Sequence, residues 1–198
     1  MSRAVALALA AVALGVAGLP LHAQSGIDQA VITGGASDVR GRIAVNQTAG
    51  ASNAQANLAA IALGWRGEAT QRVAQQVAGG ATPRDASVVI GDRAFVGSAG
   101  LLSINQSAGS ANAQANLFAA GPSGPLAAAI VTLGDAALAD VAGDPGHPGA
   151  AAPPALREAT IGGGSFGASR GVVQVNQAAG VGNASVNAIV LQLPGGAP

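Results

Sequence analysis

The sequence predicts an all-β fold of stacked strand–turn–strand repeats, and three observations lead to it. One segment occurs three times, its recurring residues are amides and glycines, and the copies contain almost no charge. The copies are GRIAVNQTAGASNAQANLAAI at 41–61, GLLSINQSAGSANAQANLFAA at 100–120 and GVVQVNQAAGVGNASVNAIVL at 171–191. A repeated unit of this size cannot bury its own apolar face and stacks on its neighbours. We therefore expect a β-solenoid or cross-β stack with irregular linkers and an N-terminal signal helix.

The first half of each copy predicts a strand that ends in a turn. Side chains alternate between the two faces of a strand, so Ile43 and Val45 share one face. A glycine follows at the same place in each copy, and glycine accepts the positive φ that a tight turn needs. The predicted turn residues are Gly50, Gly109 and Gly180.

The second half of each copy predicts a second strand. Asn53, Gln55 and Asn57 alternate with small apolar residues, which places the amides on one face. A helix over 54–63 is the competing interpretation, because alanine is the best helix former. The period of two favours the strand.

Identical amides at equivalent positions predict ladders along the stacking axis. When strands stack in register, each Asn or Gln can donate to one neighbour and accept from the other. The alternative is that these side chains are ordinary solvated polar faces. The predicted self-assembly ladder residues are Asn46, Gln47, Asn53, Gln55, Asn57, Asn105, Gln106, Asn112, Gln114, Asn116, Asn176, Gln177, Asn183 and Asn187.

The repeat extends upstream of the three copies. Ile90 and Phe95 recur as Ile161 and Phe166, whereas the first copy keeps a looser version at 31–34. Short strands are expected at 31–33, 87–90 and 160–161.

The domain organisation follows from the repeats and from the composition between them. A helical stretch at 66–78 is one possible structure within the first linker, and Gly and Pro in the second predict irregular loop. The expected segments are a signal peptide at 1–23, an N-terminal segment at 24–29, repeat 1 at 30–61, linker 1 at 62–86, repeat 2 at 87–120, linker 2 at 121–158, repeat 3 at 159–191 and a tail at 192–198.

The N-terminus predicts export. Arg3 precedes an Ala/Leu/Val run that Pro20 ends, and Ala23 offers a small residue for cleavage, which is the pattern of a secretory signal peptide. The run is too short and too poorly flanked for an uncleaved anchor. We expect a periplasmic passage, an extracellular or cell-surface location, and no membrane anchor after cleavage.

Composition argues against several classes of function. Formal net charge is zero, so no basic footprint for nucleic acid exists. With no cysteine, disulfides and thiolate metal sites are excluded. No nucleophile, base and acid can be assembled around His147. We expect no catalytic, metal or cofactor-binding residues, and therefore not an enzyme.

The third copy resembles the repeat of the Fap functional amyloids of bacterial biofilms. The matching elements are Gly164-Ser165-Phe166, Gly171, Val175-Asn176, Ala179-Gly180 and Asn183-x-Ser185-x-Asn187. Three repeats with two unlike linkers also resemble Fap subunit architecture, and curli subunits are similar more distantly. The resemblance implies Sec export, passage through an outer-membrane pore and extracellular polymerisation. It departs from the family in lacking the paired-cysteine motif with which Fap fibre subunits often end.

The leading hypothesis is a secreted structural subunit that self-assembles into cross-β fibrils of a biofilm matrix. Its partners would be further copies of itself, a related fibre subunit and the export pore. One alternative is a monomeric exported β-solenoid that acts as an adhesin or binding module. Another is an accessory or nucleating protein of the same secretion system.

Overall fold

The chain forms only β-structure in the residues that the computed structural model describes, which are 26–62, 69–77, 84–122, 131–133 and 155–193. All strand pairings in these ranges are parallel. Within the same ranges no helix is long and apolar enough to cross a membrane. The predicted signal helix at 1–23 lies outside the described residues.

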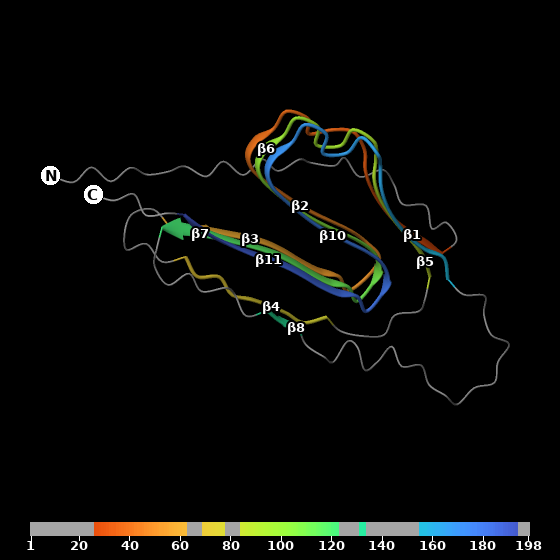
Figure 1. Ribbon diagram of the computed structural model, residues 1–198. Coiled ribbons are helices and arrows are strands. Elements are labelled where there is room, and N and C mark those ends of the chain that lie inside the picture. Colours follow the sequence, from red (N-terminus) through yellow and green to blue (C-terminus); the bar gives the residue numbers. More distant parts are fainter. Residues whose placement is uncertain (1–25, 63–68, 78–83, 123–130, 134–154, 194–198) are drawn as a thin grey trace, which may run out of the picture.

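Each repeat contributes three strands to a stack of three layers (Figure 1). Layer 1 consists of β1 (Ile27–Ile32), β2 (Arg40–Ala49) and β3 (Ala54–Ile61). Layer 2 consists of β5 (Asp85–Ile90), β6 (Ala99–Ser110) and β7 (Ala113–Pro122). Layer 3 consists of β9 (Arg157–Ile161), β10 (Arg170–Val181) and β11 (Ala184–Leu193).

Three parallel sheets run through these layers, and layer 2 is central in each. Their strand orders are β1-β5-β9, β10-β6-β2 and β11-β7-β3. The register places each residue of the copies on its equivalent, as with Gly41, Gly100 and Gly171. The edge strands of layers 1 and 3 therefore have no strand partner on their outer sides among the described residues.

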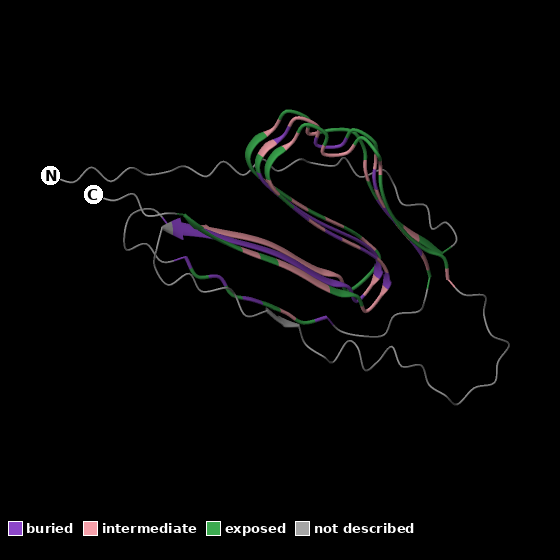
Figure 2. Ribbon diagram, viewed as in Figure 1, coloured by how far each residue is buried: buried purple, intermediate pink, exposed green. Residues whose placement is uncertain are grey.

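The interior contains apolar clusters on both faces of the β6 and β7 sheets, with the amide columns among them. Phe95 and Ile104 belong to a cluster between the β5 and β6 sheets. Leu101 packs with Phe118 between the β6 and β7 sheets, and Leu117 belongs to a further cluster on the outer side of β7. Figure 2 shows that burial concentrates in layer 2, where β6 and β7 are covered on both sides. The polar residues thus occupy a buried position that large apolar side chains take in most proteins.

The helix considered for 66–78 is wrong for the described part of that segment. Val73–Gln75 forms strand β4, which pairs in parallel with β8 (Val131–Leu133) from the segment predicted as the second linker. Val73 is buried against Leu117, and this contact favours an extended segment along the β7 sheet. Within 54–63 the strand interpretation is correct for Ala54–Ile61, which forms β3.

The upstream part of the repeat also stacks. Ile32, Ile90 and Ile161 lie in one register column. The rings of Phe95 and Phe166 stack with centroids 5.6 Å apart and planes within 4°. The first repeat contributes Ala36 to the same cluster, so it lacks a third ring.

Candidate functional site: amide columns along the stack

The predicted ladder residue Asn46 begins a continuous column of hydrogen bonds. Asn105 Nδ2 donates to Asn46 Oδ1 at 3.0 Å, and Asn176 Nδ2 donates to Asn105 Oδ1 at 2.9 Å. The strands β2, β6 and β10 position these side chains because their register places Asn on Asn in every layer. The column therefore has a direction, with each amide nitrogen pointing toward the lower-numbered layer.

Three further columns have the same direction. In each, the amide nitrogen of one layer donates to the amide oxygen of the layer before it. The bonds are Gln106 to Gln47 at 2.9 Å, Gln177 to Gln106 at 2.9 Å, Asn112 to Asn53 at 2.9 Å, Asn183 to Asn112 at 2.8 Å, Asn116 to Asn57 at 2.9 Å and Asn187 to Asn116 at 3.0 Å.

The column that begins at Gln55 differs from the other four. Gln55 Nε2 donates to Gln114 Oε1 at 2.9 Å, which is the opposite direction. The third layer has Ser185 at the register position of Gln114, so the column stops after two amides. Ser185 Oγ instead donates to Asn176 Oδ1 at 2.7 Å within its own layer.

The β6 and β7 sheets interlock through the same amides. Asn105 Nδ2 donates to Ala56 O at 2.8 Å and to Asn57 Oδ1 at 3.0 Å, both in β3 of the layer before. Asn116 of β7 in turn donates to Asn105 Oδ1 at 2.9 Å. Strand β6 therefore lies at a height between β3 and β7. Because the two sheets are staggered, the ends of the stack are stepped rather than flat.

The amides of layer 2 are buried, so loss of one of their hydrogen-bond partners would destabilise the fold. Asn105, Gln106, Asn112, Gln114 and Asn116 have no exposed surface. Burying an amide is tolerated where its donors and acceptors are satisfied, and costs about 1–3 kcal/mol for each group left without a partner. The bonds above, together with the 3.1 Å bond from Gln114 Nε2 to Gln106 O, give each of these amides a partner. The columns therefore specify the register as well as stabilise it.

The structure adds polar residues that sequence comparison of the copies missed. Gln174 is buried where the other layers have Ala44 and Ser103. Its Nε2 donates to Leu117 O at 3.1 Å, and it accepts a 3.2 Å bond from Ser103 Oγ. Comparison of the copies does not find Gln174, because the three copies have different residues at this position. The one signal in the sequence is that Gln174 is polar and lies on the same strand face as Asn176.

The predicted turn glycines form a column of their own. Gly50, Gly109 and Gly180 have φ values of 97°, 103° and 120°, which favour glycine. A Cβ on Gly109 would lie 2.0 Å from Gly180 O, and one on Gly50 would lie 2.0 Å from Gly109 O. Glycine is thus required both by the backbone conformation and by the close approach of successive layers.

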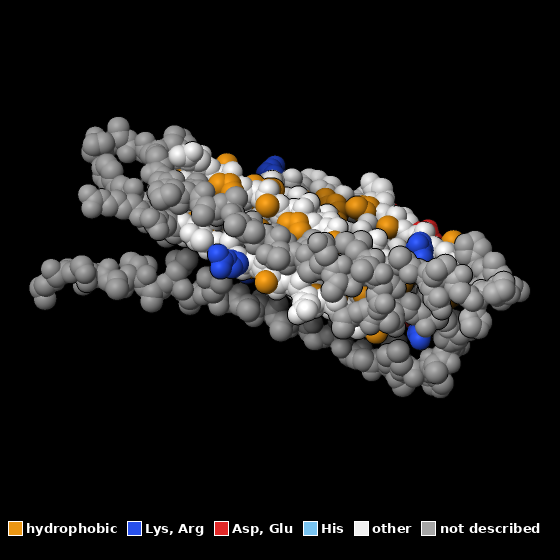
Figure 3. Space-filling view, turned by 90° about the horizontal axis from the view of Figure 1, so that it is seen from below, with side chains coloured by type: hydrophobic (Ala, Val, Ile, Leu, Met, Phe, Trp, Pro, Cys, Tyr) orange, Lys and Arg blue, Asp and Glu red, His pale blue; other side chains and the backbone are white. Residues whose placement is uncertain are grey.

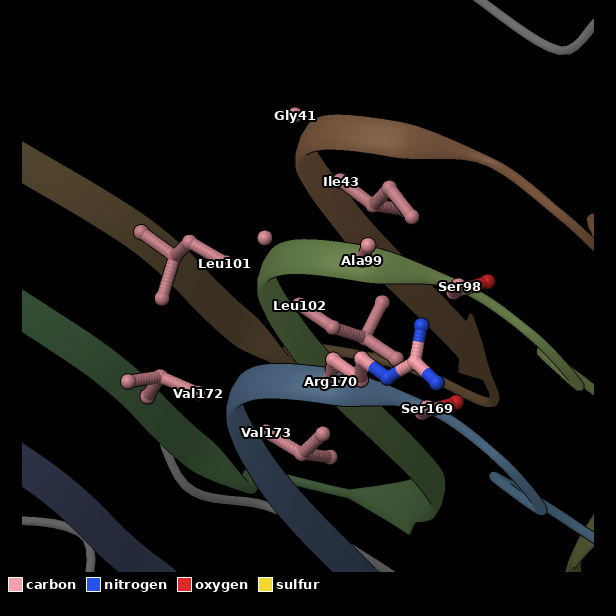
Figure 4. A pocket seen from close by; sticks show the side chains of 11 residues that line it. Gly41, Ile43, Ser98, Ala99, Leu101, Leu102, Ser169, Arg170, Val172 and Val173 are labelled. Carbon is pink, nitrogen blue, oxygen red and sulfur yellow. The ribbon is translucent and has the colours of Figure 1, made fainter.

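The surface offers no rival site among the described residues. In the described part of the face in view, Figure 3 shows separate Arg side chains and small apolar patches, with no extended patch of one charge. A shallow hollow at the start of β2, β6 and β10 is lined by equivalent residues such as Ile43, Leu102 and Val173 from successive layers (Figure 4). No group of acidic, His or Cys residues within the described part could hold a metal ion.

A stack of parallel, in-register strands with amide columns along its axis is the arrangement that cross-β proteins repeat. A family model, described as the functional amyloid protein FapB/FapC family, matches residues 16–194. The chain therefore belongs to this family of functional amyloid proteins, which is a structural rather than an enzyme family. No solved structure matches the chain.

Proposed function

We propose that this protein is a secreted structural subunit that self-assembles head to tail into extracellular cross-β fibrils of a biofilm matrix. Layer 3 of one copy would continue on layer 1 of the next. The observation that supports this most is the shared direction of four amide columns, which leaves unlike and complementary ends on one chain. A contact between unlike ends has no natural closure and produces filaments.

Layer 3 presents amide acceptors. Gln177 Oε1, Asn183 Oδ1 and Asn187 Oδ1 receive no hydrogen bond from the described residues. Layer 1 presents a matching donor, because Asn46 Nδ2 donates to none of the described residues. An added layer 1 would place that nitrogen near Asn187 Oδ1, as Asn105 lies near Asn57 Oδ1 inside the chain. Two identical ends would bring donor against donor, so the columns disfavour head-to-head contacts.

Exposed and half-buried apolar residues of the two end layers fall in matching columns. Continuing the register would place Leu191 on Ile61 and Val173 on Ile43. Ile61 and Leu191 are exposed by 62% and 43%, and an added copy would cover both. Burial of such surface is worth about 25 cal/mol per Å² before the costs of association.

Spin labels test both the polymer and its direction, and the absence of cysteine makes single labels simple to place. One preparation of residues 24–198 has Arg40→Cys labelled, and a second has Arg170→Cys labelled. Head-to-tail stacking puts these positions one layer apart, about 4.8 Å, only between different copies. Label on the same position recurs every three layers, at roughly 14 Å.

We expect fibrils with the cross-β reflection near 4.8 Å, and strong spin exchange only when the two labelled chains are mixed. Strong exchange in either preparation alone would overturn head-to-tail stacking. A mature chain that stays monomeric at high concentration would overturn self-assembly and favour the exported adhesin. A chain that polymerises only on seeds of a related fibre subunit would favour the accessory role.

A further inference from the structure

One column of paired strand positions has opposite charges at its two ends. Asp28 of β1 pairs with Ala86 of β5, and Ala86 pairs with Arg157 of β9. Among the paired positions of the described strands, no other column ends in an acid on one side and a base on the other. The column through Arg40, by comparison, has Arg170 at its far end.

The two charged side chains lie against the same glycine column. Asp28 Oδ2 is 2.9 Å from the place where a Cβ on Gly50 would stand. Arg157 Cδ is 2.8 Å from the equivalent place on Gly180. Since the turn glycines stack from layer to layer, Asp28 and Arg157 occupy equivalent positions at opposite ends of the molecule.

Asp28 is covered to a degree that is unusual for an end-layer charge. Its side chain is only 13% exposed, and among the described residues its ion-pair partner is Arg84 at 4.0 Å, whose side chain is 57% exposed. A charge that is largely removed from water gains more from a second close partner than a surface charge does. The carboxylate lies beside the side of Gly50 that faces Gly109. Arg157 lies beside the same side of Gly180, which is the outer side of layer 3, so an added copy would place Arg157 one layer from Asp28.

The geometry points to an intermolecular ion pair in which Arg157 of one copy binds Asp28 of the next. This inference rests on the head-to-tail stack proposed above and names the contact that fixes its register. A strand slip of two residues would place Arg157 on Ala30, a buried apolar position, and would separate it from Asp28 of the adjoining copy. The occupant of this end is therefore a second copy in the same register.

Charge reversal tests the ion pair. All variants are made in an Arg84→Ala parent, so that Asp28→Arg does not bring two arginines together within one chain. In this parent, Asp28→Arg brings Arg against Arg157 at each junction, and Arg157→Asp brings Asp against Asp28. Each variant alone should elongate on its own seeds at least about tenfold more slowly than the parent. An equimolar mixture should recover to within about twofold, because alternating copies restore an opposite pair at each junction.

Arg170→Asp is the matched control, since it makes the same charge change on the same layer but would face Arg40. It should not slow elongation. The ion pair is overturned if either reversal elongates at the parental rate, or if the mixture fails to recover. Failure of the self-assembly proposal is a separate result, because then the parent and the wild type would not form fibrils at all.

Discussion

The hydroxyl of Ser185 donates a 2.7 Å hydrogen bond to Oδ1 of Asn176, the oxygen to which Asn46 of a following copy would donate. Asn187 Nδ2 already donates to the same oxygen at 2.9 Å. Both acceptor sites of the Asn176 carbonyl are therefore used in the single chain. Ser185 is thus placed to resist addition of the next copy until its hydroxyl rotates away.

Ser185→Gln should speed elongation. Glutamine would restore the amide that the other two layers have at this position and would remove the hydroxyl from Asn176. One net hydrogen bond of about 0.5–1.5 kcal/mol corresponds to roughly a two- to tenfold rate increase on wild-type seeds. Ser185→Ala should give a smaller increase, because it frees the acceptor without adding an amide. Elongation rates of both variants that equal the wild-type rate would contradict this role.

Aspartate at Asn46, Asn105 and Asn176 together should block fibril formation. Aspartate cannot donate, so each layer would lose the nitrogen bond to the layer before it and would stack like charges about 4.8 Å apart. The measurement is the lag time of thioflavin fluorescence. The control variant has Asp at three exposed positions in different columns, which are Ala51, Gln76 and Ala168. The control should assemble. Equal lag times for the two triple variants would show that the column does not govern assembly.

Gly109→Ala should destabilise the stack strongly. Its φ of 103° would strain alanine by roughly 1–3 kcal/mol, and the new methyl would meet Gly180 O. Gly163→Ala is the control, because a Cβ there meets nothing within 4 Å. The midpoint of guanidinium unfolding should be lower for Gly109→Ala than for wild type. The midpoint for Gly163→Ala should be close to the wild-type value. An unfolding midpoint for Gly109→Ala close to that of wild type would contradict this prediction, because it would mean that the layers can move apart at this turn with no loss of stability.

Phe95→Ala should cost more stability than Phe166→Ala. Phe95 is fully enclosed and contacts both the Phe166 ring and the cluster around Ile90, whereas Phe166 lies partly exposed in an end layer. Loss of a buried ring typically costs about 3–5 kcal/mol. Denaturation midpoints give the comparison. The reverse order would indicate that the aromatic stack is anchored from layer 3.

Several features of this protein follow from the sequence alone because they are local or repeated. Alternation at period two distinguishes a strand from a helix at 54–61 even in an alanine-rich segment, since the helix period would scatter Gln55 and Asn57 over different faces. Repetition aligns Asn46, Asn105 and Asn176 without any knowledge of the fold. The turn at Gly50 follows from the conformational freedom of glycine.

The tertiary structure decided the features that depend on how separate sheets meet. The direction of the amide columns, the stagger between the β6 and β7 sheets and the burial of Gln174 all arise from contacts across the stack. The same is true of β4 and β8, which pair in parallel although their residues belong to no repeat. Asp28 and Arg157 are remote in sequence and belong to different repeats. Their common column exists because periodicity determines which face a side chain occupies, whereas its neighbour across a sheet or a layer is determined by long-range packing.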